Sequence, residues 1–375
     1  MSGIYFHIPF CLKKCHYCDF YSSNDPKGID ELIQSEIKEL ILRKEYLNNE
    51  MVETIYFGGG TPSLLVSKQI NALLNCVRNN FEVAVDCEIT FEANPDDLSD
   101  NYLDDLRKCG INRLSIGIQS FNDDVLKYLG RRHDSKNLNY IVKYAQKIGF
   151  NNISIDLIFG IPGFNTNVYL ESLKSAVHMD IQHISAYSLT IAEGTLFYKL
   201  LKNNRLTEID EEEMISQFNL TIDFLASNGF NQYEISNYTK EGFKSRHNSS
   251  YWEDVKYLGI GPSAHSYNQI SRQWNISNSK QYCERINTSK SFYSVEYLTL
   301  EDKFNEYVIT GLRTSKGISK NFILNSFDDK ICRHFSKETD KLFEQNLVYL
   351  ENEWIILTRK GILISDLILR NLYFM

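Results

Sequence analysis

The chain of 375 residues has room for two or three domains of roughly 150 residues each. With 48 acidic and 40 basic residues its formal net charge is −8, and it has no basic tract to neutralise phosphates, which argues against nucleic acid as a general partner. The longest uncharged run, residues 257–271, contains two glycines and a proline, so no transmembrane helix is predicted.

The first half of the chain alternates between strand-like and helical patterns. Strands are predicted at 4–8, 52–57, 87–91, 113–118, 153–159 and 181–189. Helices are predicted between them at 29–46, 67–77, 101–108, 123–129, 137–147 and 168–178. Strand and helix repeated about six times imply right-handed crossovers and a parallel sheet, whose ligands bind where the strands end.

After about residue 195 this alternation stops. The later patterns predict helices at 211–226, 297–314, 337–346 and 361–372, a strand at 231–238 and a hairpin at 347–357. We therefore predict an α/β protein with two domains, 1–235 with the strand–helix repeats and a smaller α+β domain at 236–375.

Three of the eight cysteines form a C-x3-C-x2-C run directly after the first strand: Cys11, Cys15 and Cys18. A loop with these spacings can wrap three thiolates around an iron–sulfur cluster or a zinc ion. A 4Fe–4S cluster bound by three cysteines leaves one iron open, whereas a redox-inactive structural zinc site needs a fourth ligand, for which His7 or His16 is available. No secretory signal is present, so we expect a cytoplasmic protein whose other cysteines are reduced and mostly buried.

The cysteine run, with Tyr17 directly before its third cysteine, resembles the signature of the radical SAM superfamily. The chain is similar along nearly its whole length to the oxygen-independent coproporphyrinogen III oxidase group and, within it, to the heme-chaperone branch. The matching segments are YFHIPF at 5–10, GGGTPS at 58–63, EANP at 92–95, SIGIQSF at 115–121, LGRRH at 129–133, DLIFGIPG at 156–163 and HNSSYW at 247–252. The resemblance implies a partial (β/α)6 barrel of the TIM type, a 4Fe–4S cluster on the three cysteines and bound S-adenosylmethionine (SAM).

The resemblance also assigns residues around the cluster and SAM. Read alone, the glycines after the second strand indicate either a tight turn or close approach of a ligand, and the polar residues are more typical of solvated or ion-paired surface positions. The group resemblance instead places them in the SAM or substrate pocket, with Tyr17 beside the cluster. These residues are Tyr5, Tyr17, Gly59, Gly60, Thr61, Glu92, Gln119, Arg131 and Asp156.

Two departures favour the chaperone branch over the oxidase. The oxidase has an N-terminal extension before its cluster loop, whereas Cys11 here follows ten residues, and it carries a further cysteine where this chain has Phe20. We therefore predict a heme chaperone that passes heme to acceptor proteins, respiratory proteins among them. Coproporphyrinogen III oxidation, with hydrogen abstraction from propionate side chains, is the alternative.

The segment 247–252 predicts the heme contact. Histidine is a common axial ligand of heme iron, and Tyr251 and Trp252 offer apolar faces to a porphyrin, although a lone histidine beside aromatic residues is more often structural. The heme-chaperone resemblance assigns heme binding to His247. It also implies an electron donor and heme-accepting proteins that include membrane-bound respiratory enzymes, and it is compatible with a homodimer and with a peripheral place at the membrane.

Overall fold

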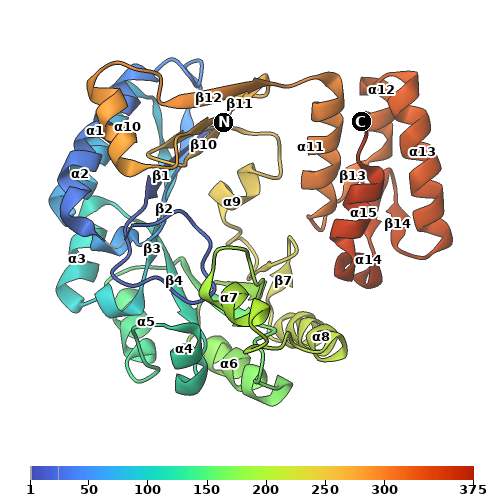
Figure 1. Ribbon diagram of the computed structural model, residues 1–375, viewed down its shortest axis with the longest axis horizontal. Helices are drawn as coiled ribbons and strands as arrows, with labels where there is room; N and C mark the ends of the chain where they lie inside the picture. Colours follow the sequence, from blue (N-terminus) through green and yellow to red (C-terminus); the bar gives the residue numbers. More distant parts are fainter. Residues whose placement is uncertain (1, 24) are drawn as a thin grey trace.

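The computed structural model describes residues 2–23 and 25–375. Its larger sheet has 12 strands in the order β12-β11-β10-β9-β1-β2-β3-β4-β5-β6-β8-β7 (Figure 1). Six consecutive strands of this sheet are parallel: β1 (Ser2–Ile8), β2 (Val52–Gly59), β3 (Val83–Ala93), β4 (Arg113–Gln119), β5 (Ile153–Phe159) and β6 (His183–Ser188). The predicted parallel α/β architecture is confirmed.

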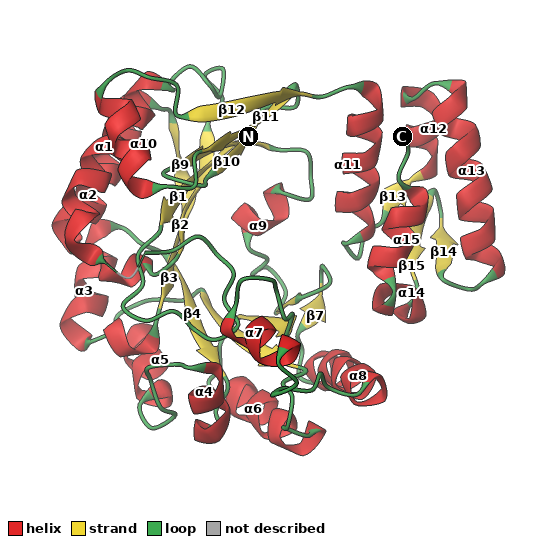
Figure 2. Ribbon diagram, in the orientation of Figure 1, coloured by secondary structure: helices red, strands yellow, loops and turns green. Residues whose placement is uncertain are grey.

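Helices cover the convex side of the curved sheet (Figure 2). They are α1 (Ile29–Leu42), α2 (Ser67–Asn80), α3 (Asp100–Cys109), α4 (Asp123–Leu129), α5 (Leu138–Lys147), α6 (Thr166–His178) and α8 (Glu211–Ser227). In α3, apolar residues three apart, Leu103, Leu106 and Cys109, are buried, the Ser99 hydroxyl caps the first turn, and Gly110 ends the helix at a φ of 95°. The opposite, concave side of the sheet is therefore left for the polar side chains described below.

Residues after 236 extend the same sheet, which the sequence patterns did not predict. Strand β9 (Lys256–Ile260) pairs parallel to β1, and β10 (His265–Tyr267), β11 (Ser271–Asn275) and β12 (Tyr293–Tyr297) follow antiparallel. The single strand predicted at 231–238 is two short strands, β7 (Asn231–Gln232) and β8 (Asn237–Thr239). Four further helices of the described chain were not predicted: α7 (Leu196–Lys202), α9 (Arg246–Ser250), α10 (Ser279–Asn287) and α12 (Lys320–Ser326).

The C-terminal residues build a smaller α+β unit beside the barrel, as predicted (Figure 1). Its elements are α11 (Leu300–Leu312), β13 (Ile318–Ser319), α12 (Lys320–Ser326), α13 (Asp329–Glu344), β14 (Val348–Glu351), β15 (Trp354–Leu357), α14 (Arg359–Leu363) and α15 (Ser365–Leu372). The hairpin at 347–357 is present as β14 and β15, whereas the helix predicted at 361–372 is interrupted at Ile364. Phe304, Phe335 and Leu372 belong to its separate hydrophobic core.

The division between the two parts depends on which core each segment joins. Leu258 and Ile260 of β9 and Tyr282 of α10 pack in the core of the barrel, whereas the second core begins at Phe304. Since a boundary at residues 235 and 236 would cut the large sheet, we propose that the domains divide between β12 and α11. In residues 2–23 and 25–375, no helix is both long enough and apolar enough to cross a membrane.

Candidate functional site

The loop with the three cysteines runs from β1 to α1, and backbone hydrogen bonds hold it in place. Its ends are joined because Cys11 N donates to Ser23 O (2.9 Å) and Ser23 N donates to Pro9 O (2.6 Å). Its middle is fixed to the far side of the barrel, since His16 N donates to Leu129 O (3.0 Å) and Phe197 N of α7 donates to His16 O (3.1 Å). The loop is thus anchored across the carboxyl ends of the parallel strands.

The three thiols are close enough to influence one another. Burial raises the pKa of Cys18, and the neighbouring thiols of Cys15 and Cys11 raise it further. The Thr61 hydroxyl donates to Cys11 Sγ and the Arg131 guanidinium donates to Cys15 Sγ, each at 3.4 Å. Donors of this kind stabilise thiolates, so the donor set suits three cysteine ligands of a cluster.

No group of three or more His, Cys, Asp or Glu side chains in the described residues is arranged to hold a metal ion. Of the two histidines available for zinc, His7 is hydrogen-bonded on both ring nitrogens, with Nδ1 3.2 Å from Tyr5 OH and Nε2 3.3 Å from Tyr21 O. His16 is held through Nδ1 alone, which lies 2.8 Å from Tyr128 O.

Glu92 lies at the end of β3 on the concave side, where its carboxylate accepts two hydrogen bonds. Tyr56 OH donates to Oε1 at 2.7 Å and Gly59 N donates to Oε2 at 3.2 Å. Burial raises the pKa of Glu92 to about 7, and nearby Asp156 raises it as well. A half-buried carboxyl that forms no ion pair within the described chain is suited to an ammonium group or to sugar hydroxyls of a ligand.

Arg131 connects the cysteine loop to the strand ends. Besides Cys15 Sγ, its guanidinium donates to Asn94 Oδ1 (2.5 Å) and Gly117 O (2.7 Å), and Asn94 Nδ2 in turn donates to Thr61 Oγ1 (3.4 Å). The buried Nε of Arg131 has no hydrogen-bond partner in the described residues, which leaves a donor for a ligand. Thr61 and Arg131 therefore each contact one thiol of the cysteine loop, and the role of each toward SAM stays a prediction.

The other predicted residues lie around this place. Tyr5 on β1 and Asp156 on β5 are half-buried on the concave side, and Gln119 ends β4 at a φ of 68° with its side chain folded over Gly117. Burial raises the pKa of Asp156 to about 6. Tyr17 packs against the small apolar cluster around α4 and α7.

The position that a side chain of Gly60 would take is filled by the chain itself, and the predicted contact of Gly60 with SAM stays a prediction. A Cβ there would lie 2.7 Å from Phe10 O and 2.9 Å from Ile8 O, and Gly60 N already donates to Ile8 O at 2.8 Å. The space beside Gly60 is filled by the backbone that leads into the cysteine loop. Its lack of a side chain is thus needed for the chain's own close approach.

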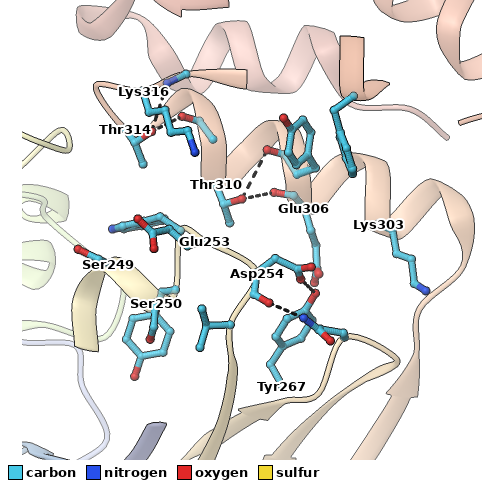
Figure 3. Close-up of a pocket in the computed structure, with 18 of the residues that line it drawn as sticks. Ser249, Ser250, Glu253, Asp254, Tyr267, Lys303, Glu306, Thr310, Thr314 and Lys316 are labelled. Atoms are coloured by element: carbon cyan, nitrogen blue, oxygen red, sulfur yellow. Dashed lines mark hydrogen bonds between the residues drawn. The ribbon is translucent and has the colours of Figure 1, made fainter. Parts of the chain in front are cut away.

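A second feature is a cleft of about 940 Å³ between the barrel and the C-terminal unit (Figure 3). It is lined by residues 249–255 at the end of α9 and in the segment that follows, by β9 to β11 and by α11 and α12. Two interactions join the two walls of the cleft. One is the Arg272–Glu306 ion pair, and in the other the Arg313 guanidinium lies 5.7 Å from the centre of the Trp252 ring. Trp252, Trp354 and several tyrosines make the lining strongly aromatic, which is typical of sites for flat apolar ligands.

His247 does not line this cleft, although Tyr251 and Trp252 of the same segment do. Its ring is buried, with Nδ1 2.8 Å from Thr54 Oγ1 and Nε2 2.9 Å from Tyr251 OH. Burial lowers the pKa of His247 to about 3, so the ring is neutral. In this conformation neither nitrogen is free for iron, and the predicted iron ligation would require both hydrogen bonds to rearrange.

The sequence patterns missed three residues of the barrel interior. Tyr56 and Asn94 hold Glu92, Thr61 and Arg131 in place, and Arg113 is fully buried with Nε and Nη1 unpartnered in the described residues. Tyr56 could have been found, because it lies two residues before Gly58 and so shares its face of the strand. Arg113 gave no such signal, since arginine at the start of a strand is usually solvated.

Comparisons with known proteins place these features in a family. The radical SAM superfamily model matches residues 5–176, and the HemN C-terminal domain model matches residues 298–364. Heme chaperone HemW of Bacillus subtilis is 34% identical over 372 residues, which cover 98% of this chain and 97% of the relative. Heme chaperone HemW of Lactococcus lactis is 34% identical over 363 residues, 96% of this chain and 94% of the relative.

A solved structure of coproporphyrinogen III oxidase (HemN) from Escherichia coli, a radical SAM enzyme, matches with a TM-score of 0.86 and 25% identity over 99% of this chain and 90% of that one. The fold is thus a radical SAM barrel followed by a smaller HemN-like C-terminal domain. Because the HemW relatives match along nearly their whole length, and the cysteine loop lies within the superfamily match, this chain belongs to the HemW family of radical SAM proteins.

Proposed function

We propose that this protein is a heme chaperone, which binds heme in the aromatic cleft and passes it to acceptor proteins. The whole-length match to proteins named heme chaperone HemW carries the proposal. The cleft supports it, because its volume of about 940 Å³ falls within the usual range of roughly 300–1,000 Å³ for sites that enclose small ligands. Trp252 and Tyr251 in its wall belong to the segment that the sequence associates with heme.

We further propose that Cys11, Cys15 and Cys18 hold a 4Fe–4S cluster with one iron left for SAM. When bound, this group supplies an electron for reductive cleavage of SAM. Residues of the chain stabilise the bound groups. Thr61 and Arg131 donate hydrogen bonds to the thiolates, and Glu92 offers its carboxylate to the amino or ribose groups of SAM. The proposal implies a cytoplasmic protein with two kinds of partner. One is an electron donor, and the other is an apoprotein that accepts heme, membrane-bound respiratory enzymes included.

The raised pKa of Glu92 makes SAM binding depend on pH. Since the carboxyl holds a proton below about pH 7, SAM affinity should rise several-fold between about pH 6 and about pH 8 as the charge forms. Without ligand, the same raised pKa lowers stability as the pH rises from 4.5 toward 7, because the unfolded chain releases the proton first. Equilibrium binding of SAM to the reconstituted protein across this pH range measures the effect.

Glu92→Gln should bind SAM more weakly and with a flatter pH profile, because the amide does not ionise. Glu253→Gln, in the cleft and outside the barrel interior, is the matched control and should keep the wild-type profile. A wild-type profile in Glu92→Gln would remove this carboxyl from the SAM site.

Coproporphyrinogen III oxidation is the second candidate function, favoured by the likeness to HemN with a TM-score of 0.86. Phe20, 64% exposed on the cysteine loop, stands where the oxidase group has a further cysteine, and this supports the chaperone instead. Incubation of the reconstituted protein with coproporphyrinogen III, SAM and a reductant separates the two: protoporphyrinogen formation at enzymatic rates would establish the oxidase.

The chaperone proposal is tested by heme binding and transfer with matched tryptophan variants. Trp252→Ala removes an aromatic face from the cleft and should weaken heme binding about tenfold, since a stacked aromatic face contributes roughly 1–3 kcal/mol to binding. Trp274→Ala on β11 is the control, because Trp274 stacks on His265 and is not among the cleft residues. Transfer of heme from wild type to apomyoglobin, followed by absorbance, is the second readout. Equal heme affinity in wild type and both variants would place heme elsewhere.

A further inference from the structure

In the part of the chain that the structure describes, the cleft offers no imidazole, thiol or thioether ligand for iron. No histidine, cysteine or methionine is among the described residues that line it. The nearby His247 and His183 lie behind the wall and are hydrogen-bonded on both ring nitrogens: His183 Nδ1 lies 2.7 Å from Ser154 Oγ and its Nε2 lies 2.9 Å from Tyr233 OH. A tetrapyrrole in this cleft is therefore not positioned to receive an imidazole or thiolate bond.

Each of the five tyrosine hydroxyls of the cleft forms a hydrogen bond with the chain itself, so the tyrosines present mainly their rings to a ligand. Tyr233 and Tyr251 are paired with His183 and His247. The other three are bound within the wall: Tyr267 OH donates to Asp254 Oδ1 (2.5 Å), Arg272 donates to Tyr257 OH (3.3 Å), and Ser319 N donates to Tyr307 OH (2.8 Å). The lining thus favours contact with the face of a macrocycle over a phenolate bond to its metal.

Positive charge in the cleft is left unpaired at one end. Ser315 N donates to Tyr233 O (3.0 Å), and Lys244 Nζ lies 5.8 Å from the centre of the Tyr233 ring, so Lys316 follows a segment held at the residue that Lys244 covers. Lys316 Nζ lies 4.5 Å from the centre of the Trp354 ring. Neither lysine has a carboxylate within ion-pair distance in the described residues, whereas Arg272 is neutralised by Glu306. Lys303, also unpaired, lies at the opposite end of the cleft (Figure 3).

We propose that the cleft recognises its tetrapyrrole through the ring face and the two carboxylates, which Lys244 and Lys316 receive, and without a bond from this chain to the iron. The inference rests on the proposed heme site. Protoporphyrin carries its two propionates on neighbouring corners, so one end of the cleft can meet both charges while the aromatic walls cover the apolar edge. Since no iron–protein bond has to break, an acceptor that supplies an axial ligand can draw the heme away.

The test compares three ligands: ferric heme, iron-free protoporphyrin IX and heme dimethyl ester. Wild type should bind heme and protoporphyrin IX within about threefold of each other and the uncharged ester at least about tenfold more weakly. The Lys244→Gln/Lys316→Gln double variant should bind both acids about tenfold more weakly and leave ester binding unchanged, because only the charge contacts are lost. Lys280→Gln, an exposed residue of α10 that does not line the cleft, is the matched control and should match wild type.

If protoporphyrin IX binds more than about a hundredfold more weakly than heme, the protein forms a bond to the iron. This result would overturn the inference. So would a double variant with wild-type affinity for both acids, or Glu253→Gln that weakens heme but not protoporphyrin IX. Trp252→Ala identifies failure of the heme site itself, since unchanged binding of all three ligands there places the site outside the cleft.

Discussion

Alanine at Cys11, Cys15 or Cys18 removes the iron–sulfur cluster from the reconstituted protein. Each variant should lose the visible absorption at roughly 400 nm, and its iron content should fall at least tenfold, on the order of the loss expected when a metal ligand is removed. The reason is that the three thiols belong to one loop, whose neighbours Thr61 and Arg131 donate hydrogen bonds and cannot replace a ligand. Iron content and absorbance after anaerobic reconstitution measure the effect.

Cys332→Ala is the control for this experiment, because Cys332 is half-buried like the loop cysteines but lies in α13 of the C-terminal domain. It should keep wild-type iron content. A loop variant that retains its iron, or a loss of iron in Cys332→Ala equal to that in the loop variants, would contradict the assignment of the three ligands.

Gly60→Ala should disturb the cysteine loop through the backbone. The added Cβ would meet Phe10 O at 2.7 Å and Ile8 O at 2.9 Å, and neither carbonyl belongs to a flexible side chain. We expect a loss of about 1–3 kcal/mol in the free energy of unfolding together with reduced cluster loading. Urea unfolding of the cluster-free protein and iron content of the reconstituted protein are the two measurements.

Gly28→Ala is the matched control, because a Cβ there has only the Phe10 ring within reach, at 3.9 Å, which is ordinary contact. If Gly60→Ala has the same free energy of unfolding as wild type and a full iron content, the backbone at the end of β2 can move to accept a Cβ without loss of stability. Gly60 would then be free again for the predicted contact with SAM.

The barrel strands could be predicted because each carries its own signal. β2 and β5, for example, are apolar runs that end at glycine-rich turns, and such runs need no knowledge of the partner strand. β11 (Ser271–Asn275) reads SRQWN and has no apolar pattern, so its place is decided by pairing with β10 and β12. The boundary between the two domains therefore depends on strand pairing between segments that are distant in the sequence. A local sequence pattern does not contain this information.

In the candidate site, too, some features are visible in the local sequence and others depend on distant partners. The three cysteines stand out by their spacing, whereas the polar residues after the strands were assigned by the resemblance to the radical SAM superfamily, and their roles toward SAM stay predictions. The surroundings of His247 were not predictable, because Thr54 and Glu88, which bond its ring and backbone, are 193 and 159 residues away in the chain. A histidine beside two aromatic residues looks like a ligand until such distant partners are known.

Heme titration of wild type and of Cys15→Ala, prepared without its cluster, tests the central claim of two separate sites most directly. The Arg131 guanidinium donates to Cys15 Sγ at the strand ends, whereas the proposed heme cleft is lined by residues of α9, α11 and α12 and of the neighbouring strands. The account predicts one heme per chain in both proteins with the same affinity and the same Soret band. Loss of heme binding together with the cluster would contradict it and would place heme at the cysteine loop.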